Sequence, residues 1–101
     1  MKSVKVFNGL LVVDLYLPGC SSLKDRRKPL RSLLQKLHNQ DFSATQFGNA
    51  DLHQRVFLAV SVVSGNAVKL EELLDAAERI ILGSSFEMRI IQRETNTFSE
   101  Y

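Results

Sequence analysis

The sequence predicts an α+β fold in which a four-stranded antiparallel sheet carries two helices on one face. Three features predict it: strand-like and helix-like segments follow each other in the order βαββαβ, turn-forming residues separate them, and 101 residues suffice for one domain with one core. This order contains two βαβ-type crossovers with a hairpin between them. The ferredoxin-like arrangement accommodates both crossovers with right-handed connections. It places the first and third strands in the middle of the sheet.

The first part of the chain supplies a strand and a helix. Residues 6–17 are rich in Val, Leu, Phe and Tyr without helical spacing, and a Pro-Gly pair closes this strand. A helix follows over residues 22–39, with Ser22 as its N-cap. Because Pro29 removes an interior hydrogen bond, we expect the helix to restart there. One side of the helix is expected in the core through Leu23, Leu30, Leu33, Leu34 and Leu37.

The second part of the chain supplies a hairpin, a helix and a last strand. Residues 42–47 form a short strand, and a Gly-Asn turn leads to a mostly β-branched return strand over residues 52–63. A second helix is predicted over residues 67–82, with Asn66 as its N-cap and a glycine placed to end it. Residues 86–95 then supply the fourth strand.

Both central strands are apolar on both faces, although only one face meets the helices. In the first strand, one face carries Val6, Leu10 and Val12, and the other carries Phe7, Leu11, Val13 and Leu15. In the third strand, one face carries Val56, Leu58, Val60 and Val62, and the other carries Phe57, Ala59 and Val63. An exposed apolar face is unusual on a monomer, so we expect a homo-oligomer, most simply a homodimer, formed through the open sheet face. Alternatively the C-terminal tail, residues 96–101, which we otherwise expect to be flexible, folds over this face.

Charge and cysteine content indicate a soluble cytoplasmic protein. Residues 1–40 hold eight Lys and Arg against two acids, and residues 41–101 hold five against nine, an asymmetry that can steer an anionic partner or orient two copies. A single cysteine, Cys20, excludes an internal disulfide and fits a reducing cytosol. The first apolar run is too polar to span a membrane and has no signal-peptide cleavage site.

The densest positive charge lies at the start of the first predicted helix. Five of the 13 Lys and Arg residues fall within eight positions there: Lys24, Arg26, Arg27, Lys28 and Arg31. All but Arg26, which points closer to the core edge, lie opposite the leucines. They form like-charge pairs four residues apart, each of which costs about 0.2–0.5 kcal/mol. A surface that binds phosphates would explain this cost, whereas an ordinary solvated helix face is the alternative.

The sheet argues against sequence-specific RNA recognition. It lacks the Lys/Arg-Gly-Phe/Tyr pattern that stacks bases in RNA-recognition modules, and the third strand offers Phe57 alone among aliphatic residues. We therefore expect any contact with nucleic acid to be made to the RNA backbone through the first helix. No binding to DNA is expected.

A second polar cluster consists of Asp51, His53, Gln54 and Arg55. These residues could form a recognition surface or an acid–base pair, but we favour a structural role in which Arg55 pairs with a nearby carboxylate. No nucleophile or metal-ligand set accompanies them, so we expect no catalytic residue, no metal and no cofactor. Asp14, inside the first strand, is expected to pair with a cation such as Lys5 or one from a partner copy.

Several motifs together resemble the YlxP-like proteins, a family of small uncharacterised bacterial proteins. They are Ser-Leu-Lys-Asp-Arg-Arg at residues 22–27, Leu-Arg-Ser-Leu at 30–33, Asp-Leu-His-Gln-Arg at 51–55 and Val-Val-Ser at 62–64. The resemblance implies a cytosolic ferredoxin-like protein without an established activity, whose gene often lies beside those for a translation initiation factor and a ribosome-binding factor. His53 stands where the family pattern usually has Trp.

The sequence thus favours a non-catalytic binding protein that contacts RNA or the ribosome through its basic helix. The alternative is a ligand-sensing dimer that holds a small molecule at the subunit interface. An enzyme of the acylphosphatase type ranks last, because no Gly-rich phosphate loop with an adjacent catalytic Arg lies near the first strand.

Overall fold

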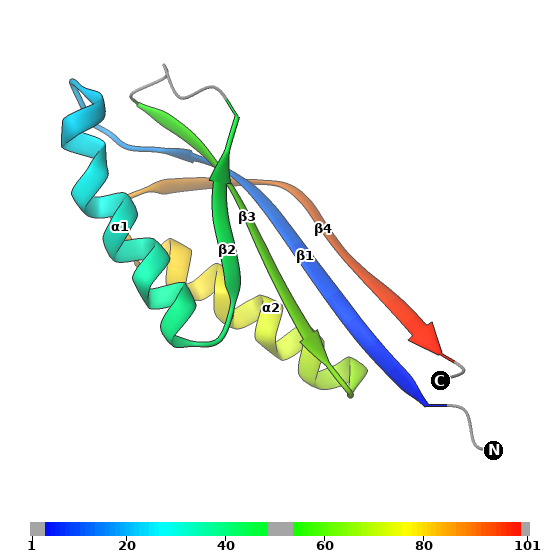
Figure 1. The fold of residues 1–101 in the computed structure, drawn as a ribbon. Coiled ribbons are helices and arrows are strands. Elements are labelled where there is room, and N and C mark those ends of the chain that lie inside the picture. The colour runs from blue at the N-terminus through cyan, green and yellow to red at the C-terminus, as the bar shows by residue number, and fades with distance from the viewer. Residues whose placement is uncertain (1–3, 49–53, 100–101) are drawn as a thin grey trace.

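The computed structural model describes residues 4–48 and 54–99 and confirms the predicted ferredoxin-like α+β arrangement (Figure 1). The elements are β1 (Lys5–Tyr16), α1 (Leu23–Asn39), β2 (Ser43–Phe47), β3 (Arg55–Ser64), α2 (Ala67–Leu82) and β4 (Glu87–Ser99). All strand pairs are antiparallel, in the order β2-β3-β1-β4, so β1 and β3 are central as predicted. Both helices lie on one side of the sheet.

Both predicted N-caps are present. The Ser22 side chain accepts a hydrogen bond from the Asp25 backbone N–H at 3.1 Å, and the Asn66 side chain accepts one from the Lys69 backbone N–H at 2.9 Å. Each bond satisfies one of the amides that have no partner within the helix. At the other end of α2, the Gly83 N–H donates to the Arg79 carbonyl at 3.0 Å.

The expected restart of the first helix at its proline is wrong, because α1 is continuous with Pro29 inside it. An interior proline costs about 3 kcal/mol. Leu30, Leu33 and Leu37 are buried on the C-terminal side of the proline. Burial of each leucine contributes about 1.5–3 kcal/mol, so together they outweigh the lost hydrogen bond.

The core fills the layer between the helices and one face of the sheet. β1 contributes Leu11, Val13 and Leu15, and most of the others come from β3, α1 and α2: Val56, Leu58, Val60, Leu30, Leu33, Leu37, Leu70, Leu74, Ala77 and Ile81. Gly9 lets α2 approach β1, since an added Cβ would lie 2.9 Å from Leu74 Cδ1. Leu23 was expected in this core but is 38% exposed, because it starts the first turn of α1 rather than facing the sheet.

The open face of the sheet carries both apolar and polar side chains. The expectation that both faces of the central strands are apolar is therefore only partly right. Along β1, Leu10 and Val12 are half-buried, but Asn8 and Asp14 share this face with them because side chains alternate along a strand. The Asn8 side-chain amide donates to Ser61 Oγ at 3.0 Å across the strand pair. The open face therefore carries an apolar centre interrupted by polar groups.

The C-terminal segment extends the sheet. Through Ser99, the residues expected as a tail continue β4, and Phe98 pairs with Val6 in β1, so this part does not fold over the open face. Residues 100 and 101 lie outside the described residues. In Figure 1 the paired ends of β1 and β4 run on past α2, and the molecule measures 58 × 22 × 18 Å.

Candidate nucleic-acid interface

Four of the five predicted basic residues form an exposed surface on α1. Lys24, Arg27, Lys28 and Arg31 are exposed, whereas three leucines of the same helix, Leu30, Leu33 and Leu37, are buried. We call these four residues the basic face of α1. They occupy the first half of the helix, on the side that no other element covers.

Arg26 does not belong to this surface. It is 8% exposed, and its Nη1 donates a hydrogen bond to the Arg55 backbone carbonyl at 2.8 Å. The side chain therefore ties the first turns of α1 to the start of β3. The prediction of Arg26 as a nucleic-acid-binding residue does not fit this placement, because a buried guanidinium that serves the fold cannot reach a phosphate outside it.

The basic face has no counter-charge among the described residues. No ion pair joins its four cations to an acid within residues 4–48 and 54–99. Asp25 is the one acid of α1, and its carboxylate accepts a hydrogen bond from Ser21 Oγ at 2.8 Å. The two like-charge pairs, Lys24 with Lys28 and Arg27 with Arg31, each oppose folding by about 0.2–0.5 kcal/mol. An external anion would remove this repulsion.

A groove of about 360 Å³ runs beside the basic face, between α1 and the edge strand β2. Two cations of the basic face stand on it, and apolar and amide side chains complete the lining: Arg27, Leu30, Arg31, Leu34, Gln35, His38 and Gln46. His38 Nε2 lies 3.2 Å from the Ala44 carbonyl oxygen, which holds α1 against β2. Helical spacing predicts the basic face but not this groove beside it, because the groove depends on the position of β2 relative to α1.

The second predicted polar cluster is only partly placed. Asp51 and His53 lie outside the described residues, and Gln54 is exposed. The predicted pairing of Arg55 with a carboxylate is confirmed: its Nη2 lies 2.9 Å from Asp14 Oδ2. These findings support the structural role for Arg55.

Asp14 is buried on the open face and shared by two arginines. Arg89 Nη2 approaches the same Oδ2 oxygen at 3.1 Å, while Asp14 Oδ1 has no hydrogen-bond partner among the described residues. The expected pairing with Lys5 is wrong, because Lys5 lies at the opposite end of β1. A register shift between Val12 and Val13 places Arg89 directly opposite Asp14. This bulge explains why sequence reasoning missed Arg89.

A third charged cluster joins β4 to α2. Arg93 pairs with Glu71 at 2.8 Å, with Asp75 at 2.9 Å and with Glu78. Burial alone would lower the pKa of Arg93, but its hydrogen bonds to the three carboxylates outweigh burial and raise that pKa above its ordinary value. Three of the four acids of α2 thus share one cation from β4.

Other chemistry is sparse in the described part of the chain. Cys20 is buried, with its Sγ 3.1 Å from the Ser22 carbonyl oxygen that accepts its hydrogen bond. Within residues 4–48 and 54–99, no three His, Cys, Asp or Glu side chains cluster in a way that could hold a metal ion. Neither described helix is long and apolar enough to cross a membrane.

These features define a small ferredoxin-like α+β protein whose first helix presents a basic face that no acid of the described residues pairs with. The chain belongs to the family described as Protein of unknown function (DUF503), whose model matches residues 9–95. No curated protein matches the chain.

Two solved structures are similar to this chain at low identity. The de novo designed protein Foldit4 is 11% identical with a TM-score of 0.42, and the alignment covers 96% of this chain and 97% of the designed one. An amidase of the hydantoinase/carbamoylase family from Burkholderia multivorans is 13% identical with a TM-score of 0.45; the alignment covers 95% of this chain and 30% of the amidase.

Proposed function

We propose that this protein is a non-catalytic binding protein that contacts RNA of the translation machinery through the basic face of α1. The observation that carries the proposal is the set of four exposed cations, Lys24, Arg27, Lys28 and Arg31, which no acid of the described residues neutralises. The resemblance to YlxP-like proteins, whose genes often lie beside translation genes, supports RNA as the polyanion. The cytosol, where ribosomes work, is the proposed location.

The geometry favours contacts to the phosphate backbone. Arginine binds phosphate through two parallel N–H donors, and Arg27 and Arg31 stand together on the groove beside β2. A phosphate held by these two side chains would leave the adjoining sugar or base over the groove. Because each phosphate contact releases counterions, four contacts to single-stranded RNA would give a slope of about −3 in log affinity against log salt.

Ribosome co-sedimentation tests the proposal. The double variant Arg27→Glu with Arg31→Glu should abolish co-sedimentation at low salt, since it replaces attraction to phosphate by repulsion. Lys5→Glu with Lys69→Glu is the matched control, because it changes the net charge equally at exposed residues outside the basic face. Treatment with ribonuclease should release the wild-type protein. Unchanged co-sedimentation of the α1 variant, or equal loss in the control, would reject the surface.

We also propose that two copies associate through the open face of the sheet. Leu10, Val12, Phe57 and Ala59 form its half-buried centre, and Val63 is 64% exposed beside them. The same face carries both signs of charge, including Glu94 on β4 and Arg55 on β3, so two copies can complement each other. Burial of this apolar surface would drive the association.

Sedimentation of paired valine variants tests the self-association. Val63→Glu places a charge on the open face and should shift the protein to monomer at micromolar concentration. Val68→Glu is the matched control, since Val68 is 69% exposed but lies on α2. A wild-type protein that sediments as a monomer would refute the dimer, as would equal dissociation of both variants.

A further inference from the structure

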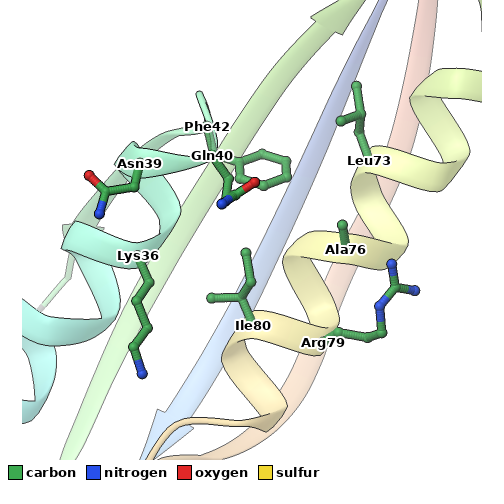
Figure 2. A pocket seen from close by; sticks show the side chains of 8 residues that line it. All are labelled: Lys36, Asn39, Gln40, Phe42, Leu73, Ala76, Arg79 and Ile80. Carbon is green, nitrogen blue, oxygen red and sulfur yellow. The ribbon is translucent and has the colours of Figure 1, made fainter.

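A groove between α1 and α2 lies on the side of α1 that faces away from β2. Its volume is about 490 Å³, and it is lined by Lys36, Asn39, Gln40, Phe42, Leu73, Ala76, Arg79 and Ile80 (Figure 2). The residues of α1 in this lining belong to the C-terminal half of the helix. None of them is part of the basic face.

The groove combines an apolar floor with positive and amide groups. Phe42 is 4% exposed, and Leu73, Ala76 and Ile80 are half-buried, so the floor is apolar surface that the fold does not fully cover. None of the eight lining residues is an acid. In Figure 2, Arg79 extends from α2 on the side away from α1, so Lys36 is the cation between the helices. The groove therefore favours an apolar molecule with negative charge.

A smaller polar cavity continues the seam at one end of this groove. It measures about 200 Å³ and is lined by Pro29, Ser32, Leu33, Lys36, Gly83, Ser84 and Ser85. Lys36 lines both cavities. Ser84 Oγ is already used, since it donates to the Ile81 carbonyl and accepts from the Phe86 N–H. The exposed hydroxyls of Ser32 and Ser85 have no hydrogen-bond partner among the described residues.

We propose that this seam binds a small amphiphilic anion, with its apolar body on Phe42, Leu73, Ala76 and Ile80 and its carboxylate or phosphate head at Lys36. Ser32 and Ser85 would donate hydrogen bonds to the head. The volume is that of an ordinary small-molecule site. A partner helix would need an apolar surface that continues past both ends of the groove. Here the apolar floor ends at a cavity lined by serine hydroxyls, which suits a molecule with one polar end.

The site lies in the helix layer and is independent of the proposed RNA contact. A ligand here would touch both helices and the loop after α1. Because a ligand that binds only the folded state stabilises it, occupancy would also raise the melting temperature.

Fluorescence of anilinonaphthalene sulfonate, an apolar ring system with one anionic head, provides the test on the full chain. Its signal should saturate at one molecule per chain and be displaced by decanoate, but not by decyltrimethylammonium, which has the same apolar length and the opposite charge. Lys36→Gln should weaken decanoate binding by about two- to fivefold, the upper range of one exposed charge contact. Ala76→Leu should weaken it by about tenfold, because the larger side chain fills the floor.

Two matched substitutions on α2 separate the site from general surface effects. Lys69→Gln and Ala67→Leu change the same residue types at exposed positions outside the groove and should leave decanoate binding unchanged. The absence of saturable binding would overturn the proposal. So would wild-type affinity in both groove variants, or equal displacement by the cationic amphiphile. Since Lys36 is exposed, its variant stays folded and informative even if Ala76→Leu does not.

Discussion

The two helices bury similar inner faces and present opposite charges to their surroundings. α1 and α2 have 17 and 16 residues and pack their leucines and isoleucine on the same side of the sheet. α1 carries six Lys and Arg against one acid, and α2 carries two against four. The inner faces form the shared core, so the two helices differ mainly in their charged sides.

The fate of these outer charges differs as well. Arg93 of β4 forms ion pairs with three carboxylates of α2. These ion pairs connect the acidic side of α2 to the sheet. The basic face of α1 receives no acid from the described residues. Acids that share a cation within the chain contribute to the fold, whereas cations that have no ion pair among the described residues are available to another molecule. This contrast supports the basic face of α1 as the proposed interaction surface.

The largest expected effect tests whether the inner faces are equivalent. Leu33→Ala in α1 and Leu74→Ala in α2 each remove a fully buried side chain, so each should lower the free energy of unfolding by about 2–5 kcal/mol. Urea denaturation measures both. If one variant loses stability within this range and the other loses almost none, one helix contributes much more to the core than the other.

The next effect concerns the proline that only α1 contains. Pro29→Ala restores an interior N–H donor but relaxes the unfolded chain, so we expect a net gain of about 1–2 kcal/mol. Thermal unfolding followed by circular dichroism at the helical band would report it. Loss of stability would instead mean that the half-buried ring of Pro29 packs better than a methyl group.

A smaller effect is expected for the charge cluster of α2. Arg93→Met leaves three carboxylates without their cation and should lower the free energy of unfolding by about 1 kcal/mol. Added salt should reduce the loss by screening the repulsion that remains. The control Arg27→Met on the basic face should change stability by less than about 0.5 kcal/mol. Equal losses would remove the contrast between the helices.

The smallest effect on stability accompanies a large effect on binding. Arg27→Glu turns the repulsion from Arg31 into an i,i+4 attraction, so the fold should gain about 0.3–0.5 kcal/mol. The same variant should weaken ribosome co-sedimentation, though less than the double variant with Arg31→Glu. Arg27→Gln, which removes the charge without reversing it, should lie between wild type and Arg27→Glu in both measurements. A variant that loses stability together with binding would indicate that the basic face serves the fold.

Local patterns predicted most of the fold and part of the candidate interface. Ser22 and Asn66 were recognisable as caps because an N-cap depends on residues within three positions of it. The exposed cations followed from helical spacing in the same way. Arg26 has the same side-chain chemistry, yet its carbonyl partner at Arg55 lies 29 positions away, beyond the reach of any local pattern.

Pairings between distant strands were the part that local patterns could not supply. Asp14 was recognised as an unusual carboxylate in an apolar strand, but its partner Arg89 depends on a one-residue bulge in the β1–β4 register. Each such shift moves every later side chain to a new neighbour. The groove beside the basic face and the seam between α1 and α2 likewise require the relative positions of elements.

By itself, the sequence determined the order of the elements, their caps and which side of each helix avoids water, because these properties depend on neighbours within a few positions. Only the tertiary structure decided that Arg26 is buried and that Asp14 is shared by two arginines. It also decided that Lys36 stands between two cavities. Those outcomes depend on strand register and helix placement, which are set by packing of the whole core rather than by any one segment.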